Sequence, residues 1–427
     1  MSEAASKQKK RFNYGWTLVF ALGSVLAPAL AAQPASAQTL HVLYNFTGQN
    51  DGANPAAGVT LDGAGNLYGT AATGGSSNCS YDGIVGCGTV FKLTHRGSAW
   101  LFAPLHGFTG NPDGGNPAAR VVFGPRGILY GTTAQGGLDN YGTVFQLQPP
   151  SRICPTPSCP WSETQLYSFQ GPYQAANPGG GDLAFDAQGN IYGTTLGGGG
   201  YLCDDQNCGT AYELSPDGQG GWSFTASAFD GGISYGPVAG LVRDTNGSFY
   251  GVTPQLPGGL FQFAGTINLL NTFSNATGAV GGLVADSAGN LYGTTSQGGT
   301  NGGGIVFEFV PSTSSLTTLY NLTGSNNYGA GPTSTLVMDA AGNLYGTTHT
   351  DGAFGQGSVF KLTHSGGNWS LTTLHNFTGL SDGGQPFGQL TIDASGNLYG
   401  TTTLGGSSLG HCYLGVGCGV VFEITPN

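Results

Sequence analysis

The residues of this 427-residue sequence with the clearest chemical potential are aspartates followed by glycine. Carboxylates can bind calcium, or act as acid and base on a glycosidic bond when a pair lies about 5–10 Å apart. The same Asp-Gly sequence also shapes tight loops, because aspartate bonds its own backbone and glycine accepts a positive φ. Its recurrence, without an Asp-x-Asp-x-Asp-Gly calcium loop, favours loop shaping. The four segments are Asp51-Gly52, Asp113-Gly114-Gly115, Asp230-Gly231-Gly232 and Asp382-Gly383-Gly384.

Two other charged positions stand out. Asp204 and Asp205 form the densest acidic point and are the best single candidate for calcium, although a solvated loop tip is the simpler interpretation. Arg243 occupies a position that is apolar in most equivalent segments, so its charge must be paired or reach water. Our working hypothesis is a desolvated Arg243 beside Asp230 or Asp244.

The elements that must position these residues occur in seven copies. The tripeptide Tyr-Gly-Thr, or a near relative, recurs about every 55 residues. Each copy has four strand-length apolar runs separated by turn residues, which predicts a four-stranded antiparallel meander of strands A to D. Such a sheet cannot bury a core alone, so the copies must pack on one another. We predict an all-β fold, a seven-bladed β-propeller, with a β-helix or open solenoid as the alternative.

The ends of the repeat region favour a closed ring. The first recognisable strand, at residues 40–46, is of the D type, and the last, at residues 419–425, is of the C type. The N-terminal strand should therefore complete the last blade and cover two sheet edges at once. We predict a single propeller domain over residues 38–427.

The repeated residues also resemble a known family. Gly-Asn-Leu-Tyr-Gly-Thr-Thr, a following Gly-Gly and then Gly-Thr-Val-Phe-Lys-Leu-Thr are similar to the GloVer tandem repeat of secreted bacterial proteins. The resemblance covers residues 40–427. It implies an exported repeat protein, often with a C-terminal sorting or anchoring signal, which we do not expect here because the sequence ends directly after a strand-like run. It brings no reaction and no catalytic residues.

Residues 1–37 have the pattern of a secretory signal peptide. Lys7, Lys9, Lys10 and Arg11 precede an apolar run over residues 16–32, and small residues follow at 35–37. An uncleaved membrane anchor is the alternative. We predict cleavage after Ala37 and a secreted or extracellular protein, with the periplasm as another destination, and no membrane span in the mature chain.

The charge balance bears on the partners. After residue 37, seven Lys and Arg stand against 21 Asp and Glu, a formal net charge of −14. Such a protein repels phosphate backbones and anionic lipid, so nucleic acid is excluded as a partner.

Eight cysteines in an exported chain predict disulfides. The cysteines form four local pairs, three of them between strands B and C, and none has the C-x2-C spacing common in zinc sites. A zinc site joining the first and seventh copies is the alternative. The predicted bridges are Cys79–Cys87, Cys154–Cys159, Cys203–Cys208 and Cys412–Cys418.

Antiparallel order places the B–C loops and the crossings from strand D to the next strand A on one side, which we call the loop face. Propellers usually bind ligands on such a face, so our binding candidates are Asp51, Asp113, Asp230, Asp382 and Arg243. Catalysis normally needs an asymmetric set of groups, whereas these polar positions repeat. We therefore expect a monomeric, non-catalytic binding or scaffold module for an extracellular glycan or protein. The alternative is a carbohydrate-active hydrolase or lyase that uses loop-face aspartates.

Overall fold

The computed structural model describes residues 38–425 except 76–78, 82–83, 151–160, 201–207, 230–235, 255–257, 274–275, 325–330, 408–411 and 413–415. The predicted signal peptide, residues 1–37, lies outside the described residues. Within the described part, no helix has the length and apolar character needed to cross a bilayer.

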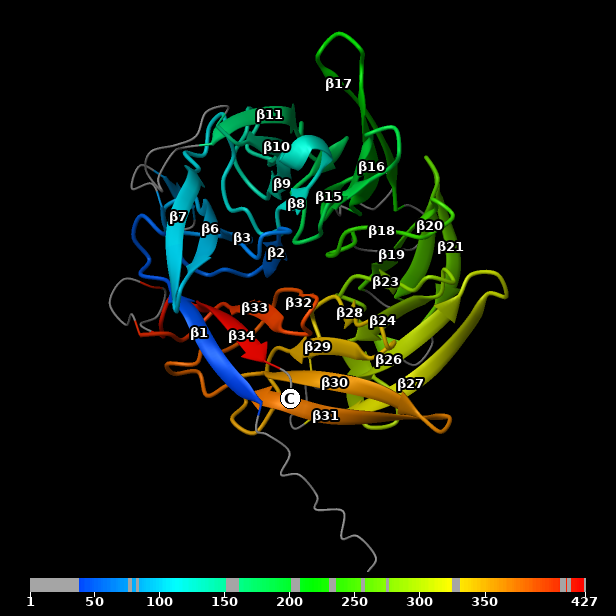
Figure 1. The fold of residues 1–427 in the computed structure, drawn as a ribbon. Helices are drawn as coiled ribbons and strands as arrows, with labels where there is room; N and C mark the ends of the chain where they lie inside the picture. The colour runs from blue at the N-terminus through cyan, green and yellow to red at the C-terminus, as the bar shows by residue number, and fades with distance from the viewer. Residues whose placement is uncertain are drawn as a thin grey trace, which may run out of the picture. The chain divides into compact units, whose positions relative to one another are not determined.

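Seven four-stranded antiparallel sheets surround a common axis and form a seven-bladed β-propeller (Figure 1). Each blade begins with a short strand A at the axis and ends with strand D at the rim, as the repeat pattern predicts. Blades 1 to 4 are β2 (Val59–Leu61), β3 (Leu67–Ala71), β6 (Thr89–Arg96), β7 (Ala99–Gly107); β8 (Val122–Phe123), β9 (Leu129–Thr133), β10 (Thr143–Gln148), β11 (Ser162–Ser168); β13 (Ala184–Phe185), β14 (Ile191–Thr195), β16 (Thr210–Pro216), β17 (Trp222–Ala228); and β18 (Val242–Arg243), β19 (Phe249–Thr253), β20 (Gly259–Phe263), β21 (Ile267–Thr272).

Blades 5 to 7 repeat this order, and the last of them takes its outer strand from the N-terminus. They are β23 (Val284–Ala285), β24 (Leu291–Thr295), β26 (Gly302–Val310), β27 (Ser315–Thr323); β28 (Val337–Met338), β29 (Leu344–Thr348), β30 (Ser358–Ser365), β31 (Asn368–Asn376); and β32 (Thr391–Ile392), β33 (Leu398–Thr402), β34 (Val420–Thr425), β1 (Thr39–Asn45). The connections contain β4 (Ser80–Tyr81), β5 (Ile84–Val85), β12 (Ala175–Ala176), β15 (Gly197–Gly198), β22 (Ala276–Thr277), β25 (Gln297–Gly298) and the 3-10 helix η1 (Pro125–Gly127).

The two ends of the propeller meet in blade 7, which confirms the predicted closure. Strand β1, drawn in blue, pairs antiparallel with the C-terminal strand β34, drawn in red, with Val42 opposite Phe422 (Figure 1). At the axis, the backbone of Gly58 in blade 1 forms a parallel bridge with Gln389 in blade 7. The ring is therefore closed both at its rim and at its centre.

The glycine of each Tyr-Gly-Thr sequence makes room for an aromatic ring of strand C in the same blade. A Cβ atom added to Gly69 would lie 2.5 Å from Cζ of Phe91, and one added to Gly293 would lie 2.6 Å from Cζ of Phe307. An aromatic ring meets the corresponding glycine in all seven blades. The remaining glycines are Gly131, Gly193, Gly251, Gly346 and Gly400.

The tyrosine of the same sequence holds the turn between strands A and B. In blade 1 the Tyr68 hydroxyl donates to Asp62, 3.1 Å away, and Asp62 also accepts the backbone N–H groups of Ala64 and Asn66. Burial alone would raise the pKa of Asp62, but these hydrogen bonds outweigh it and lower the pKa. The same Tyr–Asp bond is present in blades 3, 5, 6 and 7.

The threonine after this glycine links neighbouring blades. The Thr70 hydroxyl donates to the carbonyl of Ala119 in blade 2 over 2.9 Å, and Thr401 of blade 7 accepts the N–H of Gly58 over 3.1 Å. Thr194 and Thr347 also bond the blade that follows. The hydroxyls of Thr132 and Thr294 are exceptions, because they are buried and have no hydrogen-bond partner among the described residues. Most of the recurrent polar residues of the repeat are therefore committed to the fold.

Glu163 in β11 is an exception to the packing between blades. The residue at its place in strand D is apolar in the other six blades: Leu40, Phe102, Phe224, Ile267, Leu316 and Leu371. Its Oε1 atom is buried and has no hydrogen-bond partner among the described residues. Burial raises the pKa of the Glu163 carboxyl; His106 opposes this rise and Asp113 adds to it.

Substituting Gly69 with Ala should destabilise the propeller, because the new Cβ would collide with the Phe91 ring. Overpacking of this kind costs about 1–3 kcal/mol, which urea unfolding measures. Gly63→Ala is the matched control in the same blade, since a Cβ there meets no atom within 4 Å. Equal stability of the two variants would contradict this explanation of the repeat.

Glu163→Leu should stabilise the protein near pH 7. The folded-state pKa of Glu163 is raised above the unfolded value, about 4.3, so the ionised carboxyl costs stability above the folded pKa and this cost disappears as the pH falls. Scanning calorimetry should show a melting temperature higher by about 1–3 °C at pH 7.5, and a smaller gain at pH 4. A lower melting temperature, or a gain independent of pH, would contradict the prediction, and Glu163→Gln tests the charge alone.

Candidate functional site

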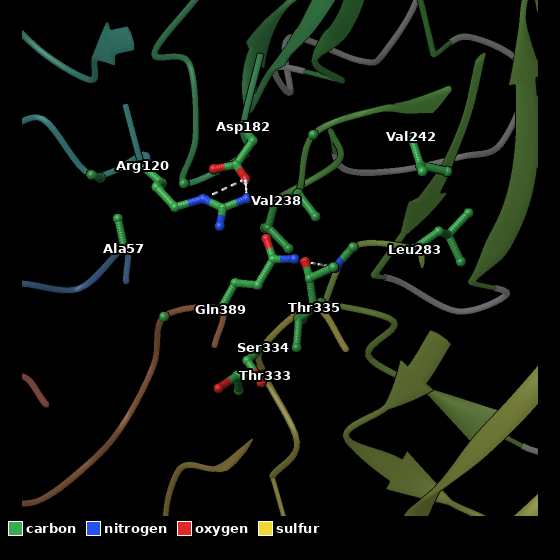
Figure 2. Close-up of a pocket in the computed structure, with 18 of the residues that line it drawn as sticks. Ala57, Arg120, Asp182, Val238, Val242, Leu283, Thr333, Ser334, Thr335 and Gln389 are labelled. Carbon is green, nitrogen blue, oxygen red and sulfur yellow. Dashed lines mark hydrogen bonds and ion pairs between the residues drawn. The ribbon is translucent and has the colours of Figure 1, made fainter. Parts of the chain in front are cut away.

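The segments that lead into strand A of all seven blades line a cavity of about 670 Å³ at the axis (Figure 2). We call it the central cavity. Its walls are mostly small and apolar, including Ala57, Ala118, Val238 and Val280. Because each crossing from strand D enters strand A on the loop face, the upper part of the cavity belongs to that face.

One position in each of these segments forms what we call the inner ring, directly before the first apolar residue of strand A. It differs from blade to blade, unlike the polar residues of the repeat. Three blades carry glycine there, and four carry a polar side chain. In blade order the inner ring is Gly58, Arg120, Asp182, Gly240, Gly282, Thr335 and Gln389.

Arg120 and Asp182 form an ion pair across blades 2 and 3. Nε of Arg120 donates to Oδ2 of Asp182 over 2.9 Å, and Nη2 donates to the same oxygen over 2.5 Å. Nη1 of Arg120 donates over 3.2 Å to the hydroxyl of Thr391 in blade 7. Arg120 thus reaches past blade 1, whose inner-ring residue is Gly58, to blade 7. A Cβ atom added to Gly58 would lie 2.2 Å from the carbonyl oxygen of Gln389, so blade 1 has no room for a side chain at this position.

The polar groups of the inner ring retain bonding capacity. Figure 2 shows the Gln389 amide between the Arg120–Asp182 pair and Thr335. Among the described residues, neither the Gln389 amide nor Oδ1 of Asp182 has a hydrogen-bond partner, and the buried hydroxyl of Thr333 in the same cavity also lacks one. Buried polar groups normally have partners, so free donors and acceptors in an apolar cavity mark a place where a ligand can bind.

The predicted loop-face aspartates are engaged in their own loops. Asp51 accepts hydrogen bonds from the Tyr44 hydroxyl over 2.9 Å and from the Thr47 N–H over 2.8 Å. Asp113 and Asp382 occupy the equivalent position in two other crossings. These two bond a histidine instead, with 3.1 Å between the histidine Nε2 and the carboxylate in each. The aspartates lie in the crossings into blades 1, 2 and 7, and each closes one loop.

Hydrogen bonding also sets the charge state of Asp113. Burial would raise its pKa, but hydrogen bonds from His106 and Thr109 outweigh this effect and hold the pKa below its ordinary value. In the part of the chain that the structure describes, no three His, Cys, Asp or Glu residues are grouped to hold a metal ion. The calcium candidates Asp204 and Asp205, and the binding candidate Asp230, lie outside the described residues.

Arg243 reaches water, so the hypothesis of a desolvated arginine is wrong. Its side chain is exposed at the lower wall of the central cavity, and its guanidinium lies over the Phe249 ring, 6.0 Å from the centroid. The neighbouring Asp244 instead accepts the backbone N–H groups of Asn246 and Ser248. An exposed charge on an aromatic face needs no acidic partner.

Two of the four predicted disulfides are present in the B–C loops of blades 1 and 7. Cys79 bonds Cys87 with a Cα–Cα distance of 5.4 Å, and Cys412 bonds Cys418 with 5.2 Å. These four sulfurs, which the zinc alternative would have joined, are thus already paired. Cys208 is disulfide-bonded, whereas Cys154, Cys159 and Cys203 lie outside the described residues.

Sequence comparison agrees with this architecture. A profile of the Gloeobacter/Verrucomicrobia repeat matches residues 32–259 and 255–427. The chain belongs to the Gloeobacter/Verrucomicrobia repeat family. This confirms the resemblance to the GloVer repeat, and no curated protein matches the sequence.

Solved structures resemble this Gloeobacter/Verrucomicrobia repeat protein only distantly. A Bacteroides uniformis protein provisionally assigned as a 6-phosphogluconolactonase has 18% identity and a TM-score of 0.48, covering 75% of this chain and 84% of its own. The nidogen/laminin complex has 15% identity and a TM-score of 0.40, with 68% and 91% covered. A Thermus thermophilus protein provisionally assigned as a glucose dehydrogenase has 13% identity and a TM-score of 0.43, with 91% and 99% covered.

The inner ring was not among the sequence candidates. The sequence candidates are mostly residues that recur, whereas Arg120, Asp182 and Gln389 occupy a repeat position that differs between copies. The signal that could have found them is this variation, a column of Gly, Arg, Asp, Thr and Gln inside an otherwise regular repeat.

A double-mutant cycle should show that Arg120 and Asp182 stabilise one another. Asp182→Ala leaves the Arg120 guanidinium without its acidic partner. This substitution should therefore lower the free energy of unfolding more in the native protein than in the Arg120→Ala variant. We expect a coupling energy of about 1 kcal/mol from urea unfolding, reduced by 0.5 M NaCl because both groups are partly exposed. Additive effects would show that the two charges do not interact.

Proposed function

We propose that this protein is an exported binding module whose central cavity takes the end of a neutral, hydroxyl-rich glycan. The observation that carries the proposal is the polar half of the inner ring. Arg120, Asp182, Gln389 and Thr335 converge from four blades on a cavity that is otherwise lined by small apolar residues. A volume of about 670 Å³ suits a ligand of one to a few sugar rings, since ligand pockets span about 300–1,000 Å³.

Sugar hydroxyls match the groups that the inner ring leaves unbonded. Each hydroxyl both donates and accepts, and the Gln389 amide and Oδ1 of Asp182 offer both roles. The remaining N–H groups of Arg120 add donors in a fixed plane. Such planar groups can bond two adjacent hydroxyls at once.

The charges support a neutral ligand. Asp182 offsets the charge of Arg120, and Arg243 is the other cation that lines the cavity. The charged residues of the surrounding B–C loops and crossings, apart from Arg120, are acidic. With a formal net charge of −14 beyond residue 37, the protein disfavours uronic acid or sulfated glycans. The N-terminal pattern and the two disulfides support an extracellular or periplasmic location, where such glycans occur.

The alternative is a hydrolase or lyase that uses the loop-face aspartates. It needs two carboxylates free to exchange protons with substrate. The carboxylate oxygens of Asp51, Asp113 and Asp382 instead accept hydrogen bonds from the loops that contain them. Among the described residues, this favours binding without turnover, and Asp182 is the carboxylate of the central cavity that an enzyme would use.

Binding should depend on the inner ring. We expect neutral oligosaccharides on a glycan array to bind the native protein, and Gln389→Ala or Asp182→Asn to weaken the best of them about tenfold, or roughly 1.4 kcal/mol, in calorimetric titration. Gln188→Ala, in the exposed turn of blade 3 on the opposite face, should leave affinity unchanged.

Two results would contradict this assignment. The first is a failure of every neutral glycan to bind, and the second is binding that Gln389→Ala does not alter. Release of cleaved products from a bound glycan, abolished by Asp182→Asn, would favour the enzyme alternative.

A further inference from the structure

Exposed large apolar side chains gather on the loop face. Ten such residues occur among the described residues, and eight of them lie in B–C loops or in crossings from strand D to strand A. The other two, Leu101 and Leu269, lie on outer strands. The eight are Val85, Leu138, Tyr173, Leu196, Phe354, Leu380, Phe387 and Val416.

Four of these residues lie on neighbouring loops of blades 6 and 7, and we call the surface that these loops present the apolar patch: Phe354, Leu380, Phe387 and Val416. The carbonyls of Leu380 and Val416 accept the N–H groups of the consecutive residues Gly406 and Gly405, over 2.7 and 2.8 Å. Those two side chains therefore stand on adjoining loops.

Phe354 and Phe387 also lie on two loops that contact one another. Gln356, two residues after Phe354, accepts the N–H of Gln385 through its carbonyl over 2.7 Å, and Phe387 follows two residues later. Phe387 also meets the His349 ring edge-on, with 5.4 Å between ring centroids, and it lines the mouth of the central cavity. The patch thus extends outward from that mouth.

The fold does not require these side chains to be apolar. The crossing that contains Leu380 closes around Asp382 in the same way as the crossings around Asp51 and Asp113, which carry Gln49 and Asn111 at that place. Leu380 is 71% exposed, and Phe354 is 60% exposed. The position of Phe387 is Ala, Gly, Val or Thr in the other blades. Exposed apolar groups that the repeat does not need point to a partner.

The charges around the patch identify the kind of partner. Asp351 and Asp382 lie on the same loops as Phe354 and Leu380. The B–C loops and D-to-A crossings of the whole sequence contain no Lys and only one Arg, Arg120 of the central cavity. The patch is therefore apolar and acidic, which complements a surface that is apolar and basic.

We propose that the apolar patch docks a segment of another protein that carries Lys or Arg beside apolar side chains. Aliphatic Leu380 and Val416 next to two phenylalanines suit protein side chains better than sugar rings, which stack on aromatic faces. The backbone hydrogen bonds and the Cys412–Cys418 bridge hold the patch in place, so little order is lost on binding. This surface is separate from the glycan contacts of the inner ring.

A library of random 12-residue peptides displayed on phage, selected against the full-length protein, tests the proposal. Selected peptides should carry Lys or Arg beside apolar residues. Their affinity should fall at least tenfold on the double variant Phe354→Ser, Leu380→Gln, and severalfold on Asp351→Asn or in 0.5 M NaCl. Leu101→Gln is the matched control for loss of an exposed leucine and should bind as the native protein does, and melting curves establish that each variant is folded.

Three kinds of result would overturn the proposal. The proposal of a cationic protein partner would be wrong if no peptide were selected, if the selected peptides lacked Lys and Arg, or if they bound the double variant as tightly as the native protein. Sedimentation that shows a dimer lost in the double variant would assign the patch to a second copy of this chain. If the double variant lost binding of a glycan that Gln389→Ala still bound, the apolar patch would be a sugar site. Loss of glycan binding in Gln389→Ala alone would concern the central cavity and the proposed glycan function, not the patch.

Discussion

The close contact between a glycine of strand B and an aromatic ring of strand C is the constraint on which the propeller depends. The ring lies where a Cβ atom would be, so the strand-C side chain packs against the backbone of its own sheet. From there it also meets aromatic residues of strand D; Phe91, for example, stacks on Phe102 in its own blade and meets Phe46, which follows the outer strand of blade 7, edge-on. The interior between blades is built on this one steric relation, repeated seven times.

This constraint explains why the conspicuous residues of the repeat serve the fold. Tyrosine, aspartate and threonine surround the glycine in the sequence. In most blades they bond a turn or the neighbouring blade, as Tyr68, Asp62 and Thr70 do, whereas the hydroxyls of Thr132 and Thr294 have no partner among the described residues. A group that already has its hydrogen-bond partners offers little to a ligand. Recurrence in this family therefore indicates folding, and positions that vary between copies are the ones free to acquire a function.

The two surfaces that we assign to ligands both use such positions. The residue before the apolar residue of strand A is Gly in blade 1, where a Cβ atom would lie 2.2 Å from the carbonyl oxygen of Gln389, and Arg in blade 2. Arg120 bonds Thr391, which joins blades 2 and 7 past blade 1 at the cavity. Phe387 lies where the central cavity meets the apolar patch, so a glycan and a protein segment could be held side by side on the loop face.

The sequence alone determined the number of blades, the order of strands, the closing role of β1 and the local disulfides Cys79–Cys87 and Cys412–Cys418. These depend on short-range patterns such as alternation, turn residues and close cysteine spacing, and repetition reinforces each pattern sevenfold. Only the tertiary structure brought Arg120 next to Asp182, 62 residues away, and to Thr391, 271 residues away. It also showed that Arg243 is exposed and that Glu163 is partly buried, with its Oε1 atom shielded from water. Those outcomes depend on how closely neighbouring blades approach at the axis and at the rim, and closure of the whole ring sets that distance.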